Sequence, residues 1–431
     1  MPELLSLPAE ILQNIFAQAD QETCRSLRLV NRLLGEIGQH NVFETLVIQL
    51  TQDYYGYDLE KIYRFPLKGQ RKTDNAQPQL WMGKDETSES LGVLLGLLSR
   101  LPRLQSVVLR FHPECPEDDS WGEHPQGEDF RQAVMQEALS TFAAMPQLKE
   151  LGLRDLWNVH DEEPKVVADR NTVLSRLESL RLNVINVNQG MQGSSDYHRE
   201  APQKFWPALP SIWLKPALSN LQHLTLYSTM YTGFFPKCDL ADLHFPKLRS
   251  LALGNHVFAH DSQLSWILSH SSTLSELYLD DCTILFQAAV FAEKLDLYET
   301  RQHTILPPSS FAPHPKLPEH SLYAAYSTRW ADYFRAFKEE LPHLRKFRFG
   351  HSPDWWEDDS MPFENEESIE IGFGSESYLV FCDGYLPSEY MERMIWDNPD
   401  EKGEALEPSK EDRVALEELC RKVGVMVTLE D

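Results

Sequence analysis

The sequence is short of basic residues and contains no long apolar run. Of its 431 residues, 40 are Lys or Arg and 66 are Asp or Glu, so the formal net charge is −26. Such a charge repels phosphate backbones and disfavours nucleic acid as a ligand. The longest apolar run, 91–98, is much shorter than the ~20 residues that a membrane helix requires. We therefore expect neither nucleic acid nor a membrane among the binding partners.

Cysteine is also scarce. The six cysteines are widely spaced, and no two of them form a C-x-x-C pair. This spacing argues against a disulfide framework and against a tetrathiolate zinc site. The first residues carry an acid, Glu3, where a secretory signal has basic residues. These features predict a protein of the cytoplasm, the nucleus or both.

What the sequence does contain is a repeated apolar motif. An apolar residue is followed by two others, three and five positions later, in eight places. In a helix the last position would fall on the opposite face, so the motif predicts a short strand. The copies begin at Phe43, Leu104, Leu148, Leu177, Leu221, Leu248, Leu274 and Leu344, and Pro102, Pro146, Pro246 and Pro342 stand two places before four of them.

Segments with helical periodicity lie between several copies, at 90–100, 130–144, 261–270 and 330–341. A helix followed by a short strand at variable intervals is typical of leucine-rich repeats with insertions. The predicted fold class is therefore α/β, a leucine-rich-repeat solenoid with a curved parallel sheet and outer helices. We expect it over 43–350, after a small helical domain over 1–42 and before an acidic segment and C-terminal cap over 351–431. Within the cap we expect a helix near 409–422, followed by a strand from Val423 to Leu429.

The N-terminal segment has a different pattern. Its apolar residues fall on one helical stripe, and Pro8 suits the first turn of that helix. Segments 7–16 and 27–32 resemble an F-box, and the whole chain resembles F-box proteins with leucine-rich repeats, fungal ones in particular. The resemblance implies a substrate receptor that binds a Skp-type adaptor. The adaptor would join it to a cullin-based, SCF-type ubiquitin ligase. The resemblance further implies adaptor contacts from Leu7, Pro8, Ile11, Leu12, Ile15, Phe16 and Val30. The alternative is that the stripe only caps the solenoid.

A substrate site is predicted on the face of the repeat strands that lies opposite the motif residues. Alternation of side chains places Arg110, Arg154 and Arg181 there on three consecutive strands. Guanidinium groups match carboxylates and phosphates, so we expect a basic site for an acidic or phosphorylated peptide, with Tyr227 and Tyr278 adding apolar contacts. The alternative is that these arginines neutralise neighbouring acids. The acids between 354 and 370 are expected to form a solvated surface.

No catalytic motif is present. We find no G-x-S-x-G, Walker A loop, G-x-G-x-x-G, H-E-x-x-H or EF-hand loop, so we expect no catalytic residue, metal or cofactor. The predicted function is a non-enzymatic substrate receptor. Two alternatives stay open: a repeat scaffold that recruits no ligase, and an enzyme whose site is built from the long insertions. The enzyme would need a deep polar pocket.

Overall fold

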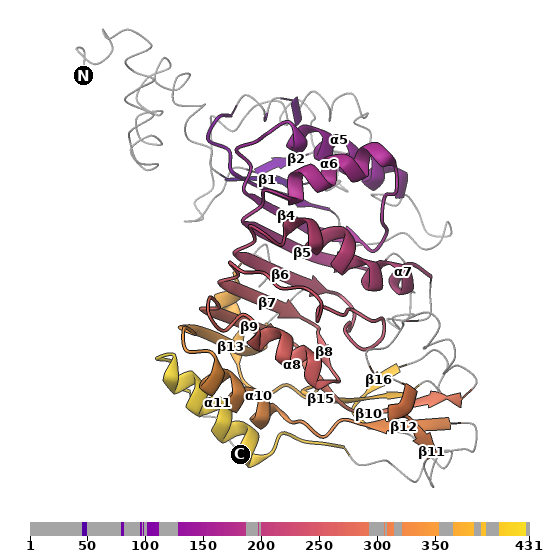
Figure 1. Ribbon diagram of the computed structural model, residues 1–431, viewed down its shortest axis with the longest axis vertical. Coiled ribbons are helices and arrows are strands. Elements are labelled where there is room, and N and C mark those ends of the chain that lie inside the picture. Colours follow the sequence, from indigo (N-terminus) through magenta and orange to yellow (C-terminus); the bar gives the residue numbers. More distant parts are fainter. Residues whose placement is uncertain are drawn as a thin grey trace, which may run out of the picture. The chain divides into compact units, whose positions relative to one another are not determined.

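The computed structural model describes ten longer segments and a few single residues (Figure 1). Contacts divide the chain into two compact units, the first made of 1–114, 122–153 and 161–177, and the second of 115–121, 154–160 and 178–431. The helical domain predicted over 1–42 lies outside the described residues. These are 45–49, 79–81, 95–96, 98, 101–111, 128–186, 197, 200–292, 306, 308–313, 321–352, 365–382, 389–393 and 405–427.

In its described residues, the first unit combines a parallel sheet with helices that include α5 and α6. Its strand β1 pairs in parallel with β2 and with β3, and β4 follows β3 in the sheet. The turn around Pro146 ends α5, and the amides of Lys149 and Glu150 then donate to the Gln105 carbonyl to start β4. The elements are β1 Thr45–Gln49, β2 Gln79–Trp81, β3 Ser106–Arg110, α5 Glu128–Ala143, the first half of β4 Glu150–Trp157, and α6 Pro164–Leu174.

The described residues of the second unit also form a largely parallel sheet. Strands β5, β6, β7, β9 and β13 are parallel neighbours in that order, and β14 pairs with β13 in the antiparallel direction. These elements and the helices that alternate with them are β5 Ser179–Ile185, α7 Glu200–Leu209, η3 Pro210–Leu214, η4 Lys215–Ala217, β6 His223–Ser228, β7 Ser250–Gly254, α8 Asp261–Leu268, β9 Glu276–Asp280, α10 Trp330–Glu340, β13 Lys346–His351, η6 Glu366–Ser368, β14 Glu370–Ile371 and α11 Lys410–Lys422.

A second, mixed sheet belongs entirely to the second unit. Its strand order is β11-β12-β10-β15-β16, with β8 also paired to β10. Strand β10 runs parallel to β8 and β15 but antiparallel to β12. The elements are β8 Val257–Phe258, β10 Thr283–Phe291, η5 Pro308–Ser310, β11 Ala312–Pro313, β12 Ser321–Ala325, β15 Tyr378–Cys382 and β16 Glu389–Met391.

The predicted leucine-rich-repeat solenoid is wrong, although each of the eight motifs does form a strand. The structure is an α/β protein with two sheets, and the second sheet has no counterpart in the repeat. The motif identifies a buried strand, but it carries no information about what the connecting residues do. Between Leu279 and Phe347 those residues make β10 and β12, which belong to the mixed sheet, as well as α10.

The helix-covered face of the parallel sheet holds the apolar core of the second unit. Motif residues such as Phe347 and Phe349 are buried, and the rings of Phe334 and Trp330 on α10 pack on them. The Trp330 indole donates a hydrogen bond to the Ser377 carbonyl at 2.8 Å. Aromatic pairs of this kind add to the stabilisation that burial gives.

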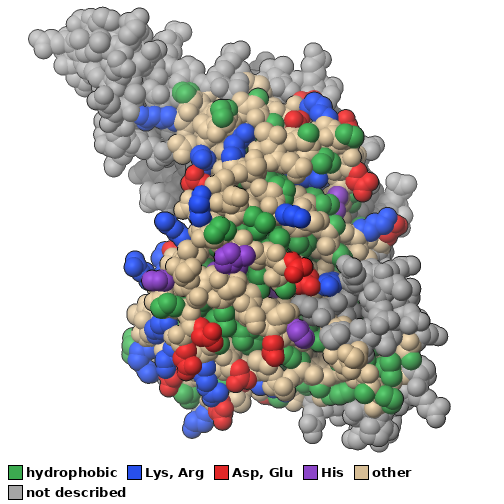
Figure 2. All heavy atoms as spheres, in the orientation of Figure 1, with side chains coloured by type: hydrophobic (Ala, Val, Ile, Leu, Met, Phe, Trp, Pro, Cys, Tyr) green, Lys and Arg blue, Asp and Glu red, His purple; other side chains and the backbone are tan. Residues whose placement is uncertain are grey.

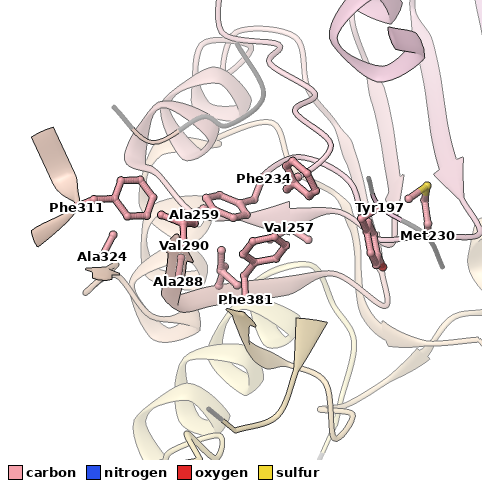
Figure 3. Close-up of a cluster of buried hydrophobic side chains, with 12 residues drawn as sticks. Tyr197, Met230, Phe234, Val257, Ala259, Ala288, Val290, Phe311, Ala324 and Phe381 are labelled. Carbon is pink, nitrogen blue, oxygen red and sulfur yellow. The ribbon is translucent and has the colours of Figure 1, made fainter. Parts of the chain in front are cut away.

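The mixed sheet has its own apolar cluster, drawn in Figure 3. The ring of Phe381 on β15 packs at centroid distances of 5.2 and 5.3 Å from Phe234 and Phe235. The Tyr390 hydroxyl on β16 accepts from the Phe235 amide and donates to the Phe235 carbonyl. These two hydrogen bonds fix the loop that contains Phe234 and Phe235 against the mixed sheet. The buried members are Tyr197, Met230, Phe234, Phe235, Val257, Ala259, Leu285, Ala288, Val290, Phe311, Ala324 and Phe381.

The last described helix begins where the sequence predicts it. Ser409 caps α11, since its hydroxyl accepts from the Asp412 amide, while the Asp412 side chain accepts from the Ser409 amide. A strand was expected after the helix, from Val423 onward, but the described residues up to 427 are not in a strand. Among all described helices, none is both long and apolar enough to cross a membrane.

Candidate binding site on the parallel sheet

One row of side chains crosses five strands of the second unit. The pairing register aligns one residue from each of β5, β6, β7, β9 and β13. Because side chains alternate along a strand, this row faces away from the leucines that pack under the helices. Its members are Arg181, Thr225, Ala252, Tyr278 and Arg348.

A segment of the same chain lies on this face. We call residues 365–371 the strap; they comprise Asn365, η6, Ile369 and β14. The strap ends as an antiparallel partner of β13, with Gly350 opposite Ile371 and His351 opposite Glu370. A Cβ atom at position 350 would overlap the Glu370 carbonyl oxygen, so only glycine lets the strap approach β13 here.

Three side chains of the sheet converge on one carboxylate of the strap. The Thr225 hydroxyl donates to Glu366 Oε1 at 3.0 Å, and His223 Nε2 lies 3.2 Å from the same atom. Arg181 Nη1 is also 3.2 Å away. Only 10% of the Glu366 side chain is exposed. Arg181, His223 and Thr225 therefore form a carboxylate site, and Glu366 fills it.

The electrostatics of this site favour the ionised acid. Burial alone would raise the pKa of Glu366, but the hydrogen bond from His223 and the charge of Arg181 outweigh it, and the pKa lies below its ordinary value. A carboxylate buried among such partners is held by charge-assisted hydrogen bonds, which are stronger than neutral ones. The site thus selects a negatively charged group.

Next to the carboxylate site is an apolar one. Ile369 of the strap is fully buried against Tyr227, Ala252 and Tyr278. Arg348 fixes the strap backbone at this point, because its Nη1 donates to the Ile369 carbonyl at 2.9 Å. The strap therefore presents an acid and, three residues later, a branched apolar side chain to one face of the sheet.

The outer side of the strap is exposed. Glu367 Oε1 lies 2.7 Å from Lys346 Nζ, and both side chains are more than half exposed. Exposed ion pairs of this type contribute little to stability. The two neighbouring acids of the strap therefore differ: Glu366 is buried in the sheet face, whereas Glu367 stays at the surface.

A second buried acid lies on the same face. Asp280, at the end of β9, accepts a hydrogen bond from Ser352 at 2.8 Å and interacts with the Tyr227 hydroxyl. Burial, followed by the nearby charge of Asp281, raises the pKa of Asp280 to about 7, although the hydrogen bonds and His351 oppose the shift. Asp281 is itself paired with His351 at 2.7 Å.

The five predicted substrate-binding residues have different surroundings. Arg181 contributes to the carboxylate site, and Tyr227 and Tyr278 are buried under Ile369 rather than exposed. Arg154 Nε lies 3.6 Å from Asp155, as the alternative of neutralised acids predicts. Arg110 is in the first unit and is 5% exposed. On the face drawn in Figure 2, acidic and basic side chains are interspersed among the described residues.

His223 and Glu366 were not among the predicted site residues. His223 stands two residues before Thr225 and so shares its face, which the same alternation rule indicates. The expectation that the acids up to Glu370 form a solvated surface is wrong for Glu366. A local pattern could not show this, because Glu366 and Thr225 are 141 residues apart in the chain.

The structure also bears on sites of other kinds. One cavity, lined by Cys238, Leu253, His256 and Trp266 among others, has a volume of about 10 Å³. This is room for a single water molecule and not for a substrate. Within the described segments, no three His, Cys, Asp or Glu side chains gather to hold a metal ion.

Neither a protein-family model nor a curated protein matches the sequence. Together with the two-sheet architecture, this contradicts the predicted membership in the F-box proteins with leucine-rich repeats. The residues that carried the resemblance, Leu7 to Phe16 and Val30, lie outside the described part of the chain. The resemblance rested on short motifs of common residue types, and no match to the family extends along the chain.

Proposed function

We propose that this protein is a non-enzymatic receptor that binds an acidic segment of a protein partner on the parallel sheet of its second unit. The observation that carries the proposal is the convergence of Arg181, His223 and Thr225 on one buried carboxylate oxygen. These donors come from two adjacent strands, so the sheet itself positions them. Sites built on rigid elements hold their geometry better than sites on loops.

The chemistry of the site supports recognition rather than catalysis. A guanidinium, an imidazole and a hydroxyl all donate toward one point, and the neighbouring surface of Tyr227, Ala252 and Tyr278 is apolar. A charged anchor beside an apolar pocket is typical of peptide-binding surfaces, in which a few buried contacts supply most of the affinity. The ligand class is therefore an acidic peptide segment.

The test is a direct binding measurement with Arg181→Ala. Fluorescence anisotropy would compare a panel of labelled acidic peptides with the same peptides in which every Glu is replaced by Gln. We expect the acidic peptides to bind a chain carrying Glu366→Gln, in which the carboxylate that fills the site is removed, and to lose about tenfold or more when Arg181→Ala is added to that chain, because a charge-assisted contact is removed. The matched control is Arg335→Ala in the same chain, since Arg335 lies on α10 and is 48% exposed. Equal losses in the two variants would contradict the proposal.

Recruitment of a ubiquitin ligase stays a prediction, because the residues expected to contact the Skp-type adaptor are outside the described segments. Affinity capture with the adaptor tests it, comparing wild type with a variant carrying Leu7→Ala, Ile15→Ala and Phe16→Ala. Adaptor captured by wild type and lost by a folded variant would support a substrate receptor. Adaptor captured by neither chain would leave a binding protein without a ligase role.

A further inference from the structure

The strap has the properties of a bound peptide. It adds to the edge of the parallel sheet as β14, it places Glu366 in the carboxylate site, and it buries Ile369 between two tyrosines. We infer that the strap is an intramolecular ligand that occupies the receptor site and that a partner must displace it. This inference rests on the proposed function and adds the form of the ligand and the regulation of its access.

Each contact of the strap specifies one property of that ligand. The carboxylate site requires an acid. The apolar contact of Ile369 requires a branched aliphatic side chain three residues after the acid. The backbone contacts require a 3-10 turn at the acid, since η6 spans Glu366–Ser368, and an extended chain after it, where β14 pairs with β13. Arg348 donates to the Ile369 carbonyl, and the Gly372 amide donates to the Phe349 carbonyl at 3.0 Å. The ligand is therefore an acidic peptide of the form Glu-x-x-Ile that pairs with β13 in the antiparallel direction.

The contacts of the strap are few enough for exchange. Its ladder with β13 joins two residue pairs only, and β14 is the terminal strand of its sheet. An edge strand is the usual place where a peptide is added to a sheet. A tethered ligand has an effective concentration in the millimolar range, so the strap competes strongly although its own contacts are few. Weakening the strap should therefore raise the apparent affinity for a peptide added in solution.

The experiment uses the full chain and a labelled synthetic peptide with the sequence of residues 364–373. Peptide binding is measured by fluorescence anisotropy for wild type and for Glu366→Gln combined with Ile369→Ser, which weakens the strap and leaves the sheet residues unchanged. We expect the double variant to bind the peptide about tenfold more tightly or better. The matched control is Glu367→Gln, an identical change at the adjacent exposed acid, and it should leave binding within about twofold of wild type.

Altered peptides and one further protein variant serve as additional controls. A version with Gln and Ser at the positions of Glu366 and Ile369 should bind neither chain. A version with phosphoserine in place of Glu366 tests whether the site accepts a phosphate as well as a carboxylate. In a fourth chain, Arg181→Ala is added to the double variant, and it should lose the gained affinity.

The outcomes separate the two proposals. Equal binding to wild type and to the double variant, with loss on Arg181→Ala, would keep the receptor site and overturn the strap as its competitor. Binding to neither chain would overturn both. If the double variant does not fold, hydrogen exchange of the wild-type chain with excess peptide decides: faster exchange in 365–371 is expected, and unchanged exchange with peptide bound overturns the inference.

Discussion

The two faces of the parallel sheet in the second unit are covered in different ways. On one face, motif residues such as Phe349 pack against helices in a buried aromatic layer that includes Trp330. On the other, a seven-residue segment contributes one buried acid and one buried isoleucine. The helix-covered face stabilises the fold because it buries a large apolar area. The strap-covered face gives binding specificity through a small number of contacts. We therefore assign stability to the helix-covered face and recognition to the strap-covered face.

The largest expected effect tests the helix-covered face. Trp330→Ala removes a fully buried indole that contacts Phe334 and Phe349 and donates to the Ser377 carbonyl. We expect the free energy of unfolding to fall by about 4 kcal/mol, as is usual for large-to-small changes at buried aromatics. Urea unfolding measures it. Val414→Ala, at a side chain that is 45% exposed, should cost less than about 0.5 kcal/mol. Similar losses in both variants would remove the distinction between core and surface.

The next effect tests the strap-covered face. In Gly350→Ala the new Cβ overlaps the Glu370 carbonyl, so β14 has to leave β13. We expect a loss of roughly 2 kcal/mol and faster hydrogen exchange confined to the strap. Gly372→Ala is the matched control, because nothing lies within 4 Å of a Cβ there. Unchanged exchange in the strap of the Gly350 variant would show that its pairing with β13 is dispensable.

A pH titration tests the strap-covered face through its buried acid Asp280. Its folded pKa of about 7 lies above the ordinary value, so the unfolded chain releases this proton first. The contribution to stability is complete below the ordinary pKa and is lost as the pH rises through 7, by up to ~1.4 kcal/mol per pH unit. Between pH 5 and 7, Asp280→Asn should reduce this slope relative to wild type. The control Asp239→Asn, at a partly exposed ion pair with Lys237, should keep it. Parallel curves for all three chains would contradict the assignment.

The smallest effect distinguishes the buried from the exposed contacts of the strap. Arg348→Ala removes the donor to the Ile369 carbonyl and should cost about 1 kcal/mol. Lys346→Ala removes only exposed ion pairs with Glu276 and Glu367 and should cost less than about 0.5 kcal/mol. Thermal unfolding at low and high salt measures both. An equal, salt-sensitive loss would mean that surface charge, not backbone fixation, holds the strap.

The strands could be predicted from the sequence, but their assembly into two sheets could not. The strands at Leu221 and Leu274 were predicted correctly because a strand with one apolar face has a local signature. The fold was predicted wrongly, because strands with this signature occur in repeat solenoids and in two-sheet proteins alike. The mixed sheet depends on pairings such as that of β10 with β15, which is set by tertiary contacts and not by neighbouring residues.

The site was predicted in part for a related reason. Alternation along the strands placed Arg181, Tyr227 and Tyr278 on one face, and the register confirms that Arg181 and Tyr278 belong to one row. The occupant of that face could not be predicted, since Glu366 has no local feature that separates it from Glu367. Their different burial is decided by sheet residues more than a hundred positions away.

One pair on the strap-covered face limits how this sequence can vary. The Tyr227 ring occupies the space in which a side chain at position 254 would stand, so Gly254 and Tyr227 together fill one volume. A larger residue at 254 overfills it and a smaller residue at 227 empties it, and each single change is destabilising. Only a joint exchange keeps the volume constant. Positions 227 and 254 should therefore be substituted as a unit, in evolution and in any redesign of this surface.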